Sequence, residues 1–352
     1  MISQLPDEQL ARRATVFPSQ LIVSKTPVRI SFGGGGTDLA AFYAKSDGLV
    51  ISATIDKYFC CVVSLRRDSR LVITSADYGI CEECDDVSKV DARGVFGLVK
   101  AVVRAFRPPV GLDIHTASDI PPGSGLGLSG AATVGTIKAV SAILGRKLPA
   151  GPIAELASTI EIEELKRPIG KQDQYASSFG GLNEIRFSLS GTTVTPLGLD
   201  GSRLRRLEKW TMLFFTGKSR DSATILLEQR GKTARGHHET LEYLREIKEL
   251  AERMKSALLS DDLARLGELV DSSWQAKRRI VSTISSSRID ELYETAKRNG
   301  AFGGKITGAG GGGFLMLVCP PENGAAVETA LTELEAQRLK FRFVARGAHI
   351  AN

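Results

Sequence analysis

Residues 121–130 of the chain read Pro-Pro-Gly-Ser-Gly-Leu-Gly-Leu-Ser-Gly, a run of small residues between two segments of different periodicity. Before it, residues 110–116 alternate apolar and polar side chains, as a half-buried strand does. After it, residues 129–144 predict a helix. A glycine-rich turn from a strand into a helix presents free backbone N–H groups and the positive end of the helix dipole, which together suit a phosphate.

Two further glycine-rich segments lie far away along the chain. Residues 29–38 read Arg-Ile-Ser-Phe-Gly-Gly-Gly-Gly-Thr-Asp, and residues 305–313 read Lys-Ile-Thr-Gly-Ala-Gly-Gly-Gly-Gly. We call residues 29–38, 121–130 and 305–313 the first, second and third glycine segments. Each places small residues beside a few polar or charged ones, so a backbone can approach a phosphate or a sugar closely. Together they predict a single nucleotide and substrate cleft built from distant segments.

Familiar nucleotide-binding motifs fit the chain poorly. Residues 125–130 match Gly-x-Gly-x-x-Gly formally, but residues 145–150 lack the acidic residue and the second strand of a dinucleotide-binding fold. The Gly-Lys-Ser at 217–219 and the Gly-Lys-Thr at 231–233 lack the earlier glycine of a Walker A loop. Protein-kinase triplets are absent. An anion-binding helix N-terminus therefore remains, in which Ser129 either caps the helix or offers its hydroxyl to Mg²⁺.

The composition is that of a folded protein larger than one compact core. The chain has 352 residues, of which 42% are hydrophobic and 24% charged. The net charge of +6 is spread out without interleaved aromatic residues, so we expect no nucleic-acid partner. The odd number of cysteines, five, argues against a secreted disulfide framework. No segment reaches the ~20 apolar residues of a membrane span, so we expect a cytoplasmic protein without membrane contact.

The chain has its strands first and its helices later. Residues 49–65 predict a β-hairpin or meander with a break near Asp56 and Lys57. A helix is expected to begin at Pro152 and to run to about Lys166. Residues 222–279 are largely helical in pattern. This order predicts an α+β architecture in two lobes.

The three glycine segments together resemble the motifs of the GHMP kinase superfamily, which includes galactokinase, homoserine kinase and mevalonate kinase. Residues 121–132 resemble its phosphate motif Pro-x-x-x-Gly-Leu-Gly-Ser-Ser, with Leu128 at the first serine position and Ser129 at the second. Residues 170–174, Gly-Lys-Gln-Asp-Gln, resemble the segment with the family's catalytic aspartate. The resemblance begins near Ser24 and continues to the end of the chain.

This resemblance implies a fold, a reaction and two cofactors. The fold is the two-lobed α+β GHMP-kinase fold, with a β-rich N-terminal lobe at residues 1–205 and an α/β C-terminal lobe at residues 206–352. The reaction is phosphoryl transfer from ATP, supported by Mg²⁺, to a hydroxyl of a small molecule. Such a reaction asks the protein mainly for positioning and for neutralisation of charge.

The resemblance also implies roles for individual residues. Asp173 would accept the proton of the sugar hydroxyl or orient that hydroxyl, and Arg29 would neutralise charge on the γ-phosphate or keep Asp173 ionised. Ser129 and Glu161 would hold Mg²⁺, although Glu163 or Glu164 could replace Glu161. ATP would be bound by Pro122, Gly123, Ser124, Gly125, Leu126, Gly127, Ser129 and Gly130. The substrate would be bound by Gly35, Gly36, Thr37, Asp38, Gln172, Arg220, Lys305, Thr307, Gly310 and Gly311.

From the residues alone, each of these has a plainer interpretation. Asp173 could cap the helix that follows it. Arg29 could be an exposed side chain of its strand. Glu161 lies on a polar helix face, where glutamates are usually solvated.

Within the superfamily, three features are most similar to the D-glycero-D-manno-heptose 7-phosphate kinases: residues 29–38, residues 170–174, and the pattern Thr216-Gly-x-x-Arg220 followed by Ser-Ala and Gln229. These phosphorylate the anomeric C1 hydroxyl and supply nucleotide-activated heptose for bacterial surface polysaccharide. The 7-phosphate would need a cationic pocket, for which the candidates are Lys25, Lys171, Arg220 and Lys305.

Two other functions stay open at this point. One is a kinase of the same fold for an unphosphorylated sugar such as fucose or galactose. The other is a non-catalytic regulator that binds a sugar or a nucleotide, which the substitution at Leu128 would favour. A homodimer also stays open, although no residue argues for one.

Overall fold

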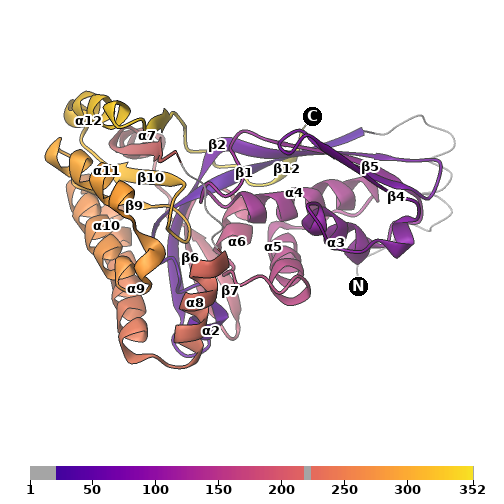
Figure 1. Ribbon diagram of the computed structural model, residues 1–352, viewed down its shortest axis with the longest axis horizontal. Coiled ribbons are helices and arrows are strands. Elements are labelled where there is room, and N and C mark those ends of the chain that lie inside the picture. The colour runs from indigo at the N-terminus through magenta and orange to yellow at the C-terminus, as the bar shows by residue number, and fades with distance from the viewer. Residues whose placement is uncertain (1–20, 218–222, 352) are drawn as a thin grey trace.

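The computed structural model describes residues 21–217 and 223–351. Two β-sheets form its framework, each covered by helices (Figure 1). The long strands β1 and β2 extend across the molecule, with helices α3 to α6 beneath them in the view of Figure 1. Helices α9 to α12 gather at the other end. This is the predicted α+β architecture.

The first sheet has the path β12-β1-β2-β5-β3-β4, with β6 paired to β2 and β7 paired to β6. Its strands are β1 (Leu21–Gly33), β2 (Gly48–Leu65), β3 (Leu71–Ser75), β4 (Ile80–Cys84), β5 (Leu112–Ser118), β6 (Leu182–Ser188), β7 (Gly191–Pro196) and β12 (His349–Ile350). Only the β3–β5 pair is parallel among the described strands. The carboxyl end of β1 leads directly into the first glycine segment.

Strand β2 corrects the prediction of a hairpin with a break near Asp56 and Lys57. It is one continuous strand, and its pairing with β1 shifts register between Pro27 and Arg29. The extra β2 residues find other partners, because Asp56 N donates to Arg342 O at 2.9 Å. A bulge therefore replaces the expected turn, since the C-terminal part of the chain supplies the missing hydrogen bonds.

Helices α3 (Gly97–Phe106), α4 (Leu128–Ile143), α5 (Ala150–Ser158) and α6 (Gln172–Phe179) belong to the first sheet's side of the molecule. Helix α4 packs on β1 and β2 and is buried along most of its length. The predicted helix from Pro152 to Lys166 begins earlier, at Ala150, and its second half is a π-helical segment, η2 (Thr159–Glu164). Short elements are α2 (Ala40–Tyr43) and η1 (Val87–Lys89).

The second sheet is antiparallel, in the order β11-β8-β10-β9. Its strands are β8 (Thr211–Phe215), β9 (Gly303–Ile306), β10 (Phe314–Val318) and β11 (Gln337–Leu339). Its helices are α7 (Gly201–Trp210), α8 (Ala223–Ala234), α9 (His238–Leu259), α10 (Leu263–Arg278), α11 (Ser287–Arg298) and α12 (Pro321–Glu333), with η3 at Ser282–Ile284. The third glycine segment begins with the last two residues of β9 and forms the turn that leads to β10.

One of the three buried hydrophobic clusters of the described residues extends through both lobes. Phe32 of β1 and Val134 of α4 belong to the same buried cluster as Met254 of α9 and Met316 of β10. The expected lobe boundary at 205/206 lies inside α7, and β12 pairs with β1 in the first sheet. We propose that the division precedes α7 and that the last residues of the chain belong to the first lobe.

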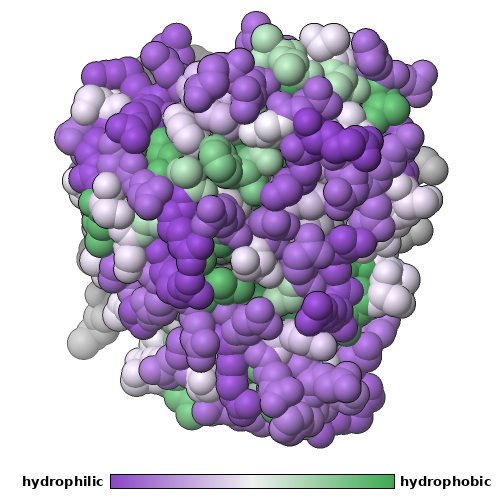
Figure 2. Space-filling model, turned by 90° about the vertical axis from the view of Figure 1, so that its left-hand side faces the viewer, coloured by the Kyte–Doolittle hydropathy of each residue, from purple (hydrophilic) through white to green (hydrophobic). Residues whose placement is uncertain are grey.

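The face formed by the C-terminal elements is mostly hydrophilic, with its hydrophobic residues in small separate areas (Figure 2). Among the described helices, none combines the length and the hydropathy that a membrane crossing requires.

Candidate active site

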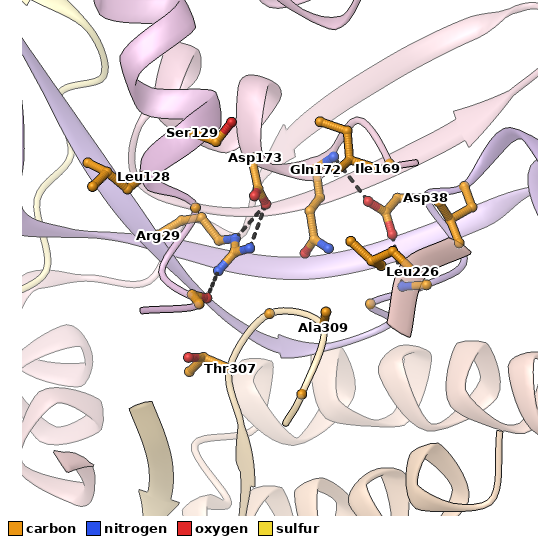
Figure 3. Close-up of a pocket in the computed structure, with 18 of the residues that line it drawn as sticks. Arg29, Asp38, Leu128, Ser129, Ile169, Gln172, Asp173, Leu226, Thr307 and Ala309 are labelled. Atoms are coloured by element: carbon orange, nitrogen blue, oxygen red, sulfur yellow. Dashed lines mark hydrogen bonds and ion pairs between the residues drawn. The ribbon is translucent and has the colours of Figure 1, made fainter. Parts of the chain in front are cut away.

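The three glycine segments meet around one cavity (Figure 3). The cavity is lined by Arg29, Gly35, Gly36 and Asp38 of the first segment, by Gly123, Ser124, Gly125, Gly127 and Ser129 of the second, and by Thr307, Gly308, Ala309, Gly310 and Gly312 of the third. Gln172 and Asp173, at the start of α6, also line the cavity. Among the described residues predicted to bind ATP or the substrate, those that do not line the cavity are Pro122, Leu126, Gly130, Thr37, Gly311 and Lys305.

The second glycine segment ends in a helix start that leaves Ser129 free of a capping role. Gly127 is the N-cap residue of α4 and adopts φ +77°, a left-handed conformation that glycine accepts readily. Ser129 lies inside the first turn and makes no cap hydrogen bond. The N–H groups of this turn have no partner within the helix, so they and the helix dipole can receive an anion from the cavity.

The second and third glycine segments are in direct contact. A side chain at Gly125, which has φ +81°, would place its Cβ 2.6 Å from the carbonyl oxygen of Thr307. The backbone N–H of Phe314 donates to Ser124 O at 3.1 Å. Residues about 180 positions apart therefore fix each other's backbones, and only a glycine fits at the point of contact.

Arg29 and Asp173 form an ion pair at the centre of the cavity (Figure 3). The Nε atom donates to Asp173 Oδ1 at 2.8 Å, and the second terminal nitrogen lies 2.6 Å from the same oxygen. The first terminal nitrogen donates to Gly125 O at 2.7 Å. The Arg29 side chain is 3% exposed, which excludes the surface interpretation, whereas that of Asp173 is 24% exposed. Asp173 is not a cap, because the N-cap of α6 is Lys171.

Ser129 and Glu161 also lie together. The Ser129 hydroxyl donates to Glu161 Oε2 at 2.6 Å, and Gln174 Nε2 donates to Glu161 Oε1 at 2.8 Å. Glu161 is fully buried, and desolvation raises the pKa of its carboxyl group. The solvated interpretation of Glu161 is therefore wrong. Glu163 and Glu164 are exposed, and Glu164 pairs with Arg104 at 2.8 Å.

Arg167, which the sequence did not suggest, completes this group. It donates to Ser129 Oγ at 2.6 Å and lies 3.5 Å from Glu161 Oε2. Its guanidinium group partly neutralises the buried carboxylate. The residue lies in an irregular segment between η2 and α6, where no periodic pattern marks an inward-facing side chain.

Asp38 lies on the side of the cavity away from Ser129 (Figure 3). It is buried, and its carboxylate accepts hydrogen bonds from Gly36 N at 2.8 Å and Gln172 N at 3.2 Å. Desolvation raises the pKa of this carboxyl group, and the nearby Asp173 raises it further. Thr37 points elsewhere, because its hydroxyl donates to Gly34 O and Leu49 O within the fold.

Two buried amides beside Asp38 have unused hydrogen-bonding atoms. Gln172 Oε1 and Gln229 Nε2 are buried and find no partner in the described part of the protein. Both residues line the cavity. Unsatisfied buried amides are rare unless a ligand or water completes them. Gln229, from α8, belongs to the sequence pattern that resembles the heptose 7-phosphate kinases, but it was not predicted to bind the substrate.

Lys277 is a further residue that sequence reasoning missed. It lines the cavity from the last turn of α10 and is 7% exposed. A signal was present, since Lys277 continues the buried face that includes Val270 and Trp274 at helical spacing. The signal is obscured by Arg278 and Arg279, because a run of three basic residues at the end of a helix is usually solvated.

The residues expected to bind the sugar's 7-phosphate lie in different places. Lys171 pairs with Glu155 at 2.6 Å, and Lys25 lies 4.5 Å from the centre of the Tyr58 ring, away from the cavity lining. Lys305 is buried, 4% exposed, in β9. Arg220 lies outside the described residues.

The donor atoms at Ser129 and Glu161 fit Mg²⁺. Mg²⁺ prefers hard oxygen ligands and is commonly bound by one or two protein groups together with substrate phosphates. Gln174 Oε1, beside Glu161, is buried without a partner. Within residues 21–217 and 223–351 no group of three or more histidine, cysteine or acidic residues could hold a metal without such phosphates.

Comparisons with known proteins agree with this geometry. Residues 95–181 match the GHMP kinases N terminal domain, and residues 254–337 match the GHMP kinases C terminal domain. The D-glycero-alpha-D-manno-heptose 7-phosphate kinase of Campylobacter jejuni is 34% identical over 93% of this chain and 97% of its own length.

Solved structures give the same picture. A D-glycero-D-manno-heptose 1-phosphate kinase from Bacteroides thetaiotaomicron superimposes with a TM-score of 0.78 at 29% identity, covering 94% of this chain and 99% of the other. A putative sugar kinase from Campylobacter jejuni superimposes with a TM-score of 0.77 at 31% identity, covering 94% and 98%.

Proposed function

The chain belongs to the GHMP kinases and transfers a phosphoryl group to a sugar hydroxyl, and we propose that this hydroxyl is the anomeric C1 hydroxyl of D-glycero-D-manno-heptose 7-phosphate. The observation that carries the reaction is the Arg29–Asp173 ion pair at the meeting point of the three glycine segments. The choice of heptose 7-phosphate is supported by the 34% identity to the Campylobacter jejuni kinase.

ATP is the phosphoryl donor of this family, and its phosphates fit the second glycine segment. Gly123, Ser124, Gly125 and Gly127 line the cavity, and α4 begins immediately after them. Free N–H groups at a helix N-terminus and small residues around them bind phosphate without a side-chain charge. Leu128 lines the cavity at the same place and packs partly on the core.

Asp173 is the proposed acceptor of the sugar's proton. The new bond forms between the anomeric oxygen and the γ-phosphorus, the bond from the γ-phosphorus to the ADP oxygen breaks, and the hydroxyl proton passes to the Asp173 carboxylate. Arg29 holds that carboxylate in position through Oδ1 and leaves Oδ2 free for the hydroxyl. Arginine stays charged at neutral pH, so Arg29 neutralises charge and moves no proton.

Ser129 and Glu161 are the proposed protein ligands of Mg²⁺. Bound there, Mg²⁺ would neutralise charge on the phosphates of ATP. Glu161 is kept available by Ser129, Gln174 and Arg167, whose hydrogen bonds and charge oppose the effect of desolvation on its pKa. Asp38, Gln172 and Gln229 are proposed to bind sugar hydroxyls on the other side of Asp173.

ADP release with a panel of acceptors tests this function. The panel contains D-glycero-D-manno-heptose 7-phosphate, the corresponding 1-phosphate, mannose, fucose and galactose, each with ATP and Mg²⁺. The 1-phosphate belongs in the panel because the Bacteroides thetaiotaomicron structure is named for that substrate. Turnover with the 7-phosphate alone is expected. Turnover only with an unphosphorylated sugar, or with the 1-phosphate, would overturn the proposed acceptor.

A further inference from the structure

Two buried lysines lie at or near the cavity: Lys277 lines it, whereas Lys305 is not a lining residue but is close enough to Lys277 and Arg29 for their charges to act on it. Lys277 comes from α10 and Lys305 from β9, and they are 7% and 4% exposed. Lysine is rarely so deeply buried unless it is paired. In the described part of the chain, neither has a carboxylate within ion-pair distance, although many other lysines and arginines do.

Their surroundings leave positive charge in excess. Lys277 Nζ donates to Gly308 O at 2.5 Å, a neutral acceptor in the third glycine segment. Lys305 is influenced by Lys277, by Arg29 and by Asp38, of which only Asp38 is an anion. Arg29 already has its own partner in Asp173. When both lysines are protonated, the cations Arg29, Lys277 and Lys305 outnumber the two nearby carboxylates, Asp38 and Asp173.

Such an arrangement is unfavourable without a ligand. Burial disfavours the charged form of both lysines and lowers their pKa values, and their mutual repulsion lowers that of Lys305 further. An apolar side chain of similar length would fill the same space equally well, so packing alone does not explain why lysines occupy these positions. Perturbed lysines in a cavity are candidates for binding an anion that compensates them.

We propose that Lys277 and Lys305 form the pocket for the phosphate group that the sugar already carries when it enters the cavity. The inference rests on the proposed function and deepens it. Lys277 lines the cavity with Asp38 and Gln229, the proposed sugar side. The proposed anion site for ATP is the helix start at the second glycine segment, where Leu128 and Ser129 lie on the opposite side of the Arg29–Asp173 pair from Asp38 (Figure 3).

The same chemistry could also serve the terminal phosphate of ATP, so the test separates the two sources. The variants are Lys277→Met and Lys305→Met, which keep an unbranched side chain of nearly the same length and remove its charge. Lys209→Met, on exposed α7, is the control for the loss of one positive charge. KM and kcat are measured for heptose 7-phosphate and for ATP by ADP release.

If the inference holds, KM for heptose 7-phosphate rises by about 10- to 150-fold in each variant, the range of one hydrogen bond between charged groups. KM for ATP stays within about twofold, and Lys209→Met behaves as the wild type. An increase in KM for ATP with unchanged KM for the sugar phosphate assigns the lysines to ATP and overturns the inference. Unchanged values for both substrates overturn it as well.

Calorimetric titration with inorganic phosphate, without nucleotide, tests the phosphate pocket independently of the proposed function. Wild-type turnover of heptose 7-phosphate decides the function by itself. Should the wild type use only an unphosphorylated sugar, the phosphate titration still decides the pocket. If the wild type binds phosphate and Lys277→Met does not, the anion pocket is supported. If both proteins bind phosphate equally, or neither binds it, the pocket is rejected.

Discussion

Asp173 is the residue whose removal should stop the chemistry while leaving nucleotide binding intact. Asp173→Asn keeps the shape of the side chain but accepts no proton, so we expect kcat to fall by about 10²- to 10⁴-fold. The proposed ATP contacts are backbone N–H groups of the second glycine segment rather than this carboxylate, so the dissociation constant of ATP should change little. Steady-state kinetics and nucleotide titration measure the two effects. A kcat near that of the wild type would remove Asp173 from the reaction.

Glu161 and Glu163 form a natural matched pair two positions apart. Glu161 contacts Ser129 and is fully buried, whereas Glu163 is exposed. Glu161→Gln should raise the Mg²⁺ concentration needed for half-maximal activity by about tenfold, since an amide is a weaker ligand than a carboxylate. Glu163→Gln should leave it unchanged. Identical Mg²⁺ dependence of the two variants would argue against Glu161 as the ligand.

Because the pKa of Lys277 is lowered, we expect the affinity for the sugar phosphate to fall at alkaline pH. This pKa is lowered to about 8, mainly by desolvation; Asp38 opposes this shift and Arg29 adds to it. The group is charged below this pH and neutral above it. As pH rises through about 8, kcat/KM for the sugar phosphate should therefore fall, by at most about tenfold per pH unit for one proton.

The same pH profile in Lys277→Met is the control. Lys305, Arg29 and Asp38 are the other charged groups around Lys277. If the alkaline fall persists unchanged in Lys277→Met, one of the remaining groups causes it instead.

The second and third glycine segments support each other, because their backbones are in contact at Gly125 and Thr307. Gly125→Ala should be strained at φ +81° and should also force the Thr307 carbonyl away. Gly236→Ala, at φ +72° with open space around it, carries the strain alone, about 1–2 kcal/mol of stability. We expect Gly125→Ala to lose more stability than this and to raise KM for ATP. Denaturant unfolding and ADP release compare the two, and equal behaviour would mean that the contact is unimportant.

Local pattern predicted most helices and strands of this protein, and the errors have physical causes. The break in β2 was expected from Asp56 and Lys57, yet residues near Arg342 complete the strand there. The helix expected to begin at Pro152 starts at Ala150 and widens to a π-helix that turns Glu161 inward. Both outcomes depend on distant partners, which override local propensity.

The shared core makes the whole molecule the unit of stability. Met254 of α9 lies against Gly33 at the end of β1, and the same buried cluster continues into both lobes. We expect one cooperative unfolding transition. Both tryptophans, Trp210 and Trp274, lie in the second half of the chain, so their fluorescence reports on that lobe. It should change at the same denaturant concentration as far-UV circular dichroism. Two separated transitions would mean that the lobes unfold independently.

The sequence by itself determined the α+β class, the three glycine segments, and the membership in the GHMP kinases. These depend on short stretches whose small residues, charges and periodicity act locally. Tertiary structure alone decided that Arg29 meets Asp173, 144 positions away, and that Glu161 rather than Glu163 faces Ser129. It also buried Lys277 and Lys305 near each other without carboxylate partners in the described chain. Burial and long-range contacts decide which side chains meet and how readily each is charged, and a local sequence pattern does not encode burial or long-range contacts.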